Sequence, residues 1–146
     1  MAALQRSVAS LRVFGDDLDP SEISRLLGAQ PSRGHRKGEE LPTRSGVAAR
    51  VARTGLWCLD APDAEPEDIN GQVAVLLGAL TSDLTTWRNI ASQYTVRLFC
   101  GWFMRRANEG VDVGPDTLEA LASRRIELSL DIYGPDEDPS SDVPVA

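Results

Sequence analysis

Apolar side chains recur at helical spacing between residues 66 and 91. Seven of them stand three or four positions apart and share one helix face: Ile69, Val73, Leu76, Leu80, Leu84, Trp87 and Ala91. Thr81, Ser82 and Asp83 interrupt the pattern with residues that prefer helix caps, so we expect the helix to kink or restart there. A stripe this long requires a large apolar partner. A sheet built from the flanking segments is the candidate.

Alternating apolar and polar positions predict strands on both sides of this helix. The clearest segments are residues 7–14, 55–61, 94–103 and 126–133. Residues 94–103 are apolar on both faces, which is typical of a central strand. In the last segment Leu128, Leu130 and Ile132 are expected to point inward. Residues 32–46 lack periodicity and are predicted to form a loop with a short edge strand near 37–41. Residues 47–52 and 55–61 flank Arg53-Thr54, a candidate hairpin turn.

The order of these elements predicts an α+β fold, in which an antiparallel sheet carries its helices mainly on one face. Asp19-Pro20-Ser21-Glu22 is a helix start, and Pro115 opens a further helix. We expect a ferredoxin-like β-α-β-β-α-β core with a C-terminal α-β extension. A parallel doubly wound sheet is the alternative, disfavoured because no Gly-rich phosphate loop follows any strand. Residues 1–134 are predicted to form one domain and residues 135–146 an acidic, disordered tail.

Charge changes this picture in one region. The chain of 146 residues has a formal net charge of −7. Residues 33–53 carry six cations and two carboxylates, a local +4, which leaves −11 on the rest. An acidic protein is a poor ligand for nucleic acid or an anionic membrane. Two cysteines without CxxC spacing, no membrane-length apolar run and no signal-peptide core favour the cytoplasm. Fourteen Arg against one Lys suggests a GC-rich bacterial genome.

Three segments together resemble a bacterial family of uncharacterised proteins, the domain-of-unknown-function 4279 family. They are residues 14–31 (FGDDLDPSEISRLLGAQP), 55–57 (GLW) and 130–134 (LDIYG). Arg36-Lys37-Gly38 resembles the basic Gly-containing segment that precedes the Trp strand in that family. The resemblance implies a small α+β domain over most of the chain and supplies no activity.

The basic loop is the strongest candidate site. Five of its residues are candidates to bind a phosphate or carboxylate group together, as a clamp: Arg33, Arg36, Lys37, Gly38 and Arg44. The alternative is a solvated loop whose cations pair loosely with Glu39 and Glu40. His35 is the sole histidine, and Cys58 and Cys100 lie in apolar strands, so we expect no metal site, no cofactor and no reactive thiol. The aspartates of residues 16–19 are expected to serve in a turn and a cap.

One sheet face is predicted to have no helix to cover it. We therefore expect a homodimer in which sheet faces or edges pack together, with these candidate contact residues: Phe14, Trp57, Phe99 and Phe103. No set of convergent catalytic groups is recognisable, so the chain is expected to be a non-catalytic binding or interaction domain. Two alternatives are a module that binds a small anionic ligand through residues 33–44, and an immunity-type inhibitor of a basic partner protein.

Overall fold

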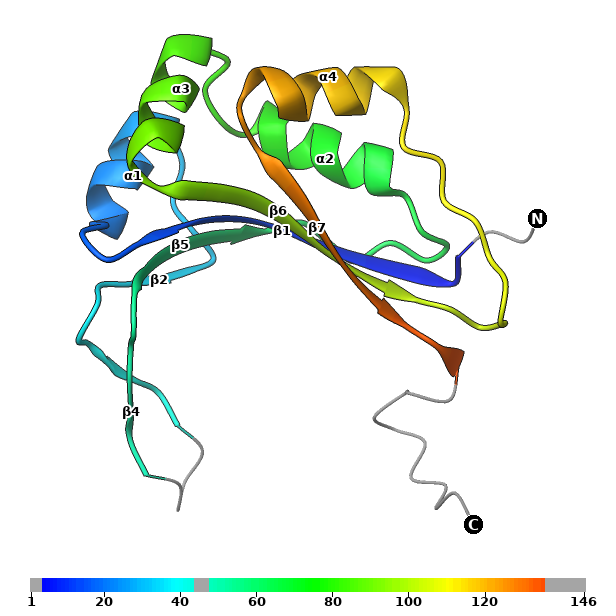
Figure 1. Cartoon of the computed structure of the whole chain (residues 1–146), viewed down its shortest axis with the longest axis horizontal. Helices are drawn as coiled ribbons and strands as arrows, with labels where there is room; N and C mark the ends of the chain where they lie inside the picture. Colours follow the sequence, from blue (N-terminus) through cyan, green and yellow to red (C-terminus); the bar gives the residue numbers. More distant parts are fainter. Residues whose placement is uncertain (1–3, 44–47, 136–146) are drawn as a thin grey trace.

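The fold is a layer of helices on one face of a five-stranded sheet, accompanied by a small two-stranded ribbon (Figure 1). The structure is a computed structural model that describes residues 4–43 and 48–135. In chain order its elements are β1 (Arg6–Gly15), α1 (Pro20–Leu27), β2 (Arg33–His35), β3 (Glu40–Leu41), β4 (Arg50–Val51), β5 (Gly55–Asp60), α2 (Ile69–Gly78), α3 (Leu84–Gln93), β6 (Thr95–Phe103), α4 (Pro115–Ser123) and β7 (Glu127–Tyr133). Arg44 and nearly all of the predicted acidic tail lie outside the described residues.

The strand order of the main sheet is β2-β5-β1-β6-β7, and the ribbon pairs β3 with β4. Strand β1 pairs antiparallel with both β5 and β6, and β2 pairs antiparallel with β5. The predicted α+β class is confirmed. The expectation of an antiparallel sheet is wrong at its edge, because β7 runs parallel to β6. Helix α4 connects these two strands and returns the chain to the starting end of β6, as a crossover between parallel strands must. The ferredoxin-like description of the first part stays a prediction.

Local sequence explains the first helix. The Asp19 side chain accepts a hydrogen bond of 3.0 Å from the Ser21 backbone N–H, and Pro20 takes the first helical position, as predicted. Gly28 ends the helix with φ of 81°, in the left-handed region that a residue without a Cβ enters at little cost. The short amphipathic helix buries Ile23 and Leu27 and packs on β5.

The long apolar stripe is carried by two helices. Helix α2 ends at Gly78 and α3 begins at Leu84, so the predicted restart at residues 81–83 is confirmed. Asp83 caps α3 by accepting from the Thr85 backbone N–H at 3.0 Å. The stripe residues Val73, Leu76, Leu80 and Trp87 are buried, whereas Leu84 is half-buried. A single straight helix of that length would run off the sheet, and the break lets α3 turn toward β6, which it contacts.

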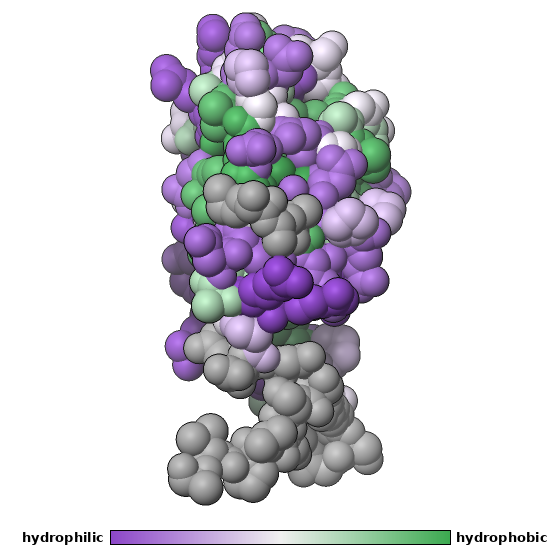
Figure 2. Space-filling view, turned by 90° about the vertical axis from the view of Figure 1, so that its right-hand side faces the viewer, coloured by the Kyte–Doolittle hydropathy of each residue, from purple (hydrophilic) through white to green (hydrophobic). Residues whose placement is uncertain are grey.

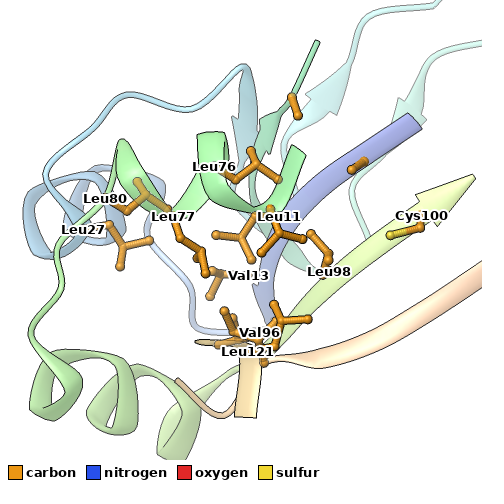
Figure 3. Packing of buried hydrophobic residues seen from close by; sticks show 14 of the residues in the cluster. Leu11, Val13, Leu27, Leu76, Leu77, Leu80, Val96, Leu98, Cys100 and Leu121 are labelled. Atoms are coloured by element: carbon orange, nitrogen blue, oxygen red, sulfur yellow. The ribbon is translucent and has the colours of Figure 1, made fainter. Parts of the chain in front are cut away.

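The core lies between the helices and the sheet. Figure 3 shows leucines of α2 facing Leu11 and Val13 of β1, with Val96 and Leu98 of β6 beside them. These sheet residues are at most 3% exposed. A buried polar contact also joins the two layers: Ser7 Oγ donates to Gln72 Oε1 at 2.7 Å, and Gln72 Nε2 donates to the Ser7 carbonyl at 2.9 Å. Because these groups satisfy one another, their burial is tolerated.

Candidate functional site

The face of the sheet opposite the helices is the most distinctive surface of the described residues. All four described helices lie on the upper side of the sheet in Figure 1, and none of them covers the lower side. The strand register places one set of large side chains on this lower side, which we call the open face: Arg6, Arg12, Phe14, Arg97, Phe99, Phe103 and Tyr133. The β3–β4 ribbon extends beyond the sheet on the same side (Figure 1).

Guanidinium groups cover the aromatic rings of the open face. The distances from each guanidinium carbon to the ring centroid are Arg6–Phe103 4.4 Å, Arg12–Phe99 4.3 Å and Arg97–Phe14 4.9 Å. Phe103 also stacks on Tyr133, with centroids 4.9 Å apart and planes 9° apart. A cation above a ring is attracted by the negative face of its π system, and the arginine stems shield the rings from water. The rings are therefore half-buried although no helix lies over them.

Carboxylates accompany most of the arginines on this side of the sheet. Three such pairs form among the described residues: Arg97–Glu127, Arg33–Asp60 at 2.7 Å and Arg6–Asp63 at 3.5 Å. Arg12 differs from its neighbours, because its Nε donates to Ser10 Oγ at 3.2 Å and no described carboxylate forms an ion pair with it. In the β1–β6 register, Arg12 stands directly opposite Arg97.

Trp57 is not part of the open face. It stands opposite Val13 in the β1–β5 register and is 0% exposed beneath the helices, where its Nε1 donates to Ser24 Oγ at 3.0 Å. Assigning Trp57 to the same face as Phe14 was therefore wrong. The cause is that β5 is apolar on both sides, so alternation alone did not show which side meets α1. Phe14, Phe99 and Phe103 do share one face.

The basic loop is tied to the body of the protein by ion pairs. Arg36 Nη2 lies 2.6 Å from Asp19 Oδ2, and Lys37 Nζ lies 3.0 Å from Asp16 Oδ2. The hydrogen bond and charge of Lys37 hold the pKa of Asp16 below its ordinary value. Arg33 is engaged by Asp60, as described above. The three described candidate cations, Arg33, Arg36 and Lys37, are therefore each paired with a separate carboxylate.

Two further loop residues have structural explanations. Gly38 adopts a φ of 90°, and its N–H donates to the Ala52 carbonyl at 2.9 Å, so it serves a turn between the loop and the ribbon. His35 lies on β2 opposite Leu56 and is half-buried. The aspartates of residues 16–19 could be recognised in the sequence, but only the fold shows that Asp16 and Asp19 form ion pairs with cations about 20 positions away.

Both thiols are buried. Burial raises the pKa of Cys58, and it raises the pKa of Cys100 to about 12, because the apolar surroundings disfavour a thiolate. At neutral pH both groups are therefore neutral thiols, which are poor nucleophiles. Among residues 4–43 and 48–135, no group of three or more His, Cys, Asp and Glu side chains is placed to hold a metal ion.

A groove of about 610 Å³ between α2 and α4 was not predicted from the sequence. Its walls are mainly apolar and include Val73, Leu77 and Leu80. Asn70 stands at its rim with both polar atoms engaged: Nδ2 donates to the Asp112 carbonyl, and Oδ1 accepts from Gly114 N–H and Thr117 Oγ1. These bonds fix the loop before α4 and leave the amide with little capacity to bind a ligand.

A family model described as "Domain of unknown function (DUF4279)" matches residues 5–135. The chain belongs to the DUF4279 family. The match covers every element from β1 to β7 in full, so the fold described above is that of a DUF4279 domain. A comparison with curated proteins found no match, and a comparison with solved structures found none. In the described part of the chain, no helix is long and apolar enough to cross a membrane.

Proposed function

We propose that this DUF4279 chain is a non-catalytic interaction domain that binds a partner protein through the open face of its sheet. The observation that carries the proposal is Arg12. It stands opposite Arg97, and like charges in directly opposed positions destabilise a sheet. Glu127 compensates for Arg97, whereas no described carboxylate pairs with Arg12. A cation kept at the centre of a sheet at a cost in stability is expected to serve an interaction outside the fold.

The open face suggests the chemistry of the partner. Phe99 and Phe103, half-buried beneath Arg12 and Arg6, give the open face its apolar component, and Arg12 provides donors that suit a carboxylate. Arginine and aromatic residues are enriched in the buried centres of protein interfaces and among the residues that contribute most to affinity. We therefore infer a partner surface in which an Asp or Glu side chain is surrounded by apolar groups.

The non-catalytic part of the proposal rests on the state of the reactive side chains. Cys58 and Cys100 are buried with raised pKa values, and the described cations Arg33, Arg36 and Lys37 of the basic loop are each paired with a separate carboxylate. The same pairing argues against the small-anion clamp, because a ligand would have to displace Asp16, Asp19 and Asp60 from their partners. We place the domain in the bacterial cytoplasm on the compositional grounds given above.

An inhibitor of a basic partner is the second candidate, which the net charge of −7 favours. Such a partner would contact the acidic outer surfaces rather than Arg12. The two candidates therefore predict opposite outcomes for one substitution. Arg12→Glu should abolish binding through the open face, whereas it should leave binding to a basic partner unchanged or stronger.

The test is affinity capture from the source organism with immobilised wild type, Arg12→Glu and a matched control, Val75→Glu. Val75 lies on α2 and is 58% exposed, so its substitution introduces a carboxylate of the same kind on the helical side. A partner recovered by wild type and control is then purified, and its dissociation constant is measured with each variant. We expect Arg12→Glu to weaken binding at least tenfold, about 1.4 kcal/mol. Equal affinities for wild type and Arg12→Glu would contradict the proposal.

A further inference from the structure

The backbone of β7 forms an open edge of the main sheet. The strand has β6 on one side, and no described strand lies on its other side. The Tyr133 carbonyl accepts from the Met104 N–H at 3.0 Å, which directs the backbone groups of Tyr133 toward β6. Backbone groups alternate in direction along a regular strand, so those of Leu128, Leu130 and Ile132 point away from the sheet. Three residues of this seven-residue strand thus offer donors and acceptors to a further strand.

The side chains of the same three residues are apolar and half-exposed. Leu128, Leu130 and Ile132 are 38%, 42% and 49% exposed, although they lie on the helical side of the sheet. Their neighbours Leu98 and Cys100 on β6 are 1% and 0% exposed on that side. The prediction that these three side chains point to the helical side is therefore correct, but they are not buried there, because α4 covers them only in part. Figure 2 shows apolar surface concentrated in the upper, helix-bearing half of this end of the molecule.

We propose that β7 pairs antiparallel with β7 of a second copy, about a two-fold axis that passes beside Leu130. This arrangement places each outward-facing residue opposite another outward-facing residue, so the outward-facing N–H and C=O groups of both copies find partners. The side-chain pairs across the junction would be Leu130–Leu130, Leu128–Ile132, Ser129–Asp131 and Glu127–Tyr133, in each case between one copy and the other. The apolar row then continues across the junction on the helical side.

The charged residues of β7 favour this register over the registers shifted by one or two residues. A shift by one residue would oppose outward-facing residues to inward-facing ones and apolar side chains to polar ones. A shift by two residues in one direction would oppose Glu127 to Asp131 of the second copy, and in the other direction Asp131 to itself. Like charges directly opposite one another destabilise a sheet. The register centred on Leu130 avoids both contacts and pairs all seven residues of the strand.

Packing of two open faces is the competing arrangement for a homodimer. It would bring Arg6, Arg12 and Arg97 of one copy close to the same three residues of the other. At the centre of such an interface Glu127 would compensate for the charge of Arg97 but not for that of Arg12. The edge arrangement keeps these guanidinium groups apart. It also leaves the open faces of both copies accessible, so it does not depend on the partner proposed above.

The first test is the mass of the purified chain in solution, measured by sedimentation equilibrium from micromolar to sub-millimolar concentration. We expect the mass to rise from 15.8 kDa toward twice that value. Leu130→Lys should hold it at the monomer mass, because two ammonium groups would meet at the axis, while Val75→Lys should leave the rise unchanged. A half-exposed position tolerates lysine, and circular dichroism checks that each variant is folded. A monomer at every concentration, or a dimer that withstands Leu130→Lys, would overturn the proposal.

The second test fixes the register with single cysteines. In the proposed pairing, the two Leu130 Cα atoms would be about 5.5 Å apart, within the range of about 4.4–6.8 Å for a disulfide. The Cα atoms of the two Leu128 residues would be offset by four positions along the strands, a distance of roughly 14 Å. Leu130→Cys should therefore form a covalent dimer on mild oxidation and Leu128→Cys should not. The native thiols are buried and do not compete. Faster cross-linking of Leu128→Cys, or none with Leu130→Cys, would show that the register is wrong.

Discussion

Replacement of Leu76 by Ala tests whether the helical layer is packed on the sheet as described. Leu76 lies on α2, is 2% exposed and faces β1 (Figure 3). The substitution removes three carbon atoms, which at about 0.8 kcal/mol each amounts to about 2.4 kcal/mol of lost burial. The cavity that is left raises the expected loss of unfolding free energy to as much as about 5 kcal/mol. Val75→Ala is the matched control, because Val75 is the adjacent residue of the same helix and is 58% exposed.

The assay is urea unfolding followed by far-ultraviolet circular dichroism, with a thermal melt as a second measure. For 146 residues the unfolding entropy is roughly 0.3 kcal/mol/K, so the expected loss corresponds to a fall of about 8–16 °C in Tm. Val75→Ala should change stability by less than about 0.5 kcal/mol. If Leu76→Ala melts within two degrees of wild type, or if both variants lose the same stability, α2 does not bury this face against β1.

Three further expectations follow from the contacts. Gln72→Leu should cost about 1–3 kcal/mol, because it leaves the Ser7 hydroxyl hydrogen and the Pro62 carbonyl without their Gln72 partners. The double variant with Ser7→Ala should cost less than the sum of the single changes, and additive losses in a double-mutant cycle would contradict the contact. Cys100, with its pKa of about 12, should not react with a thiol reagent at pH 8 until the chain unfolds, and rapid labelling of the native chain would show that it is accessible. Asp16→Asn should be slightly less stable than wild type at neutral pH, because Lys37 lowers the pKa of Asp16 in the folded chain. This difference in stability should be lost as the pH falls below 3.8, where Asp16 becomes protonated. A difference that does not depend on pH would contradict this expectation.

Local patterns predicted the elements of this fold well. The break at residues 81–83, the Asp19 cap and the Gly28 helix end all depend on side chains close in sequence, which is why they could be recognised. The assignment of β5 faces was different. Leu56 and Cys58 alternate with Trp57 and Leu59, so both sides are apolar, and only the position of α1 decides that Trp57 is covered.

Features that depend on distant segments could be predicted only in part. The cations near residue 36 and the aspartates of residues 16–19 were both noticed, but nothing local indicates that they pair. The parallel direction of β7 depends on where α4 crosses the sheet. The open face was expected from the one-sided helices, whereas the arginines above its rings required the strand register, which aligns Arg12 with Arg97.

The central claim, that the open face is the binding surface, is tested most directly by site-specific photocross-linking in the source organism. A benzophenone amino acid is placed at Phe99, beneath Arg12 on the open face, or at Val75 on the exposed side of α2. We predict that the Phe99 position forms a covalent adduct with one partner protein, that Arg12→Glu removes the adduct, and that the Val75 position does not form it. An adduct with the same partner at Val75 and not at Phe99 would contradict the account.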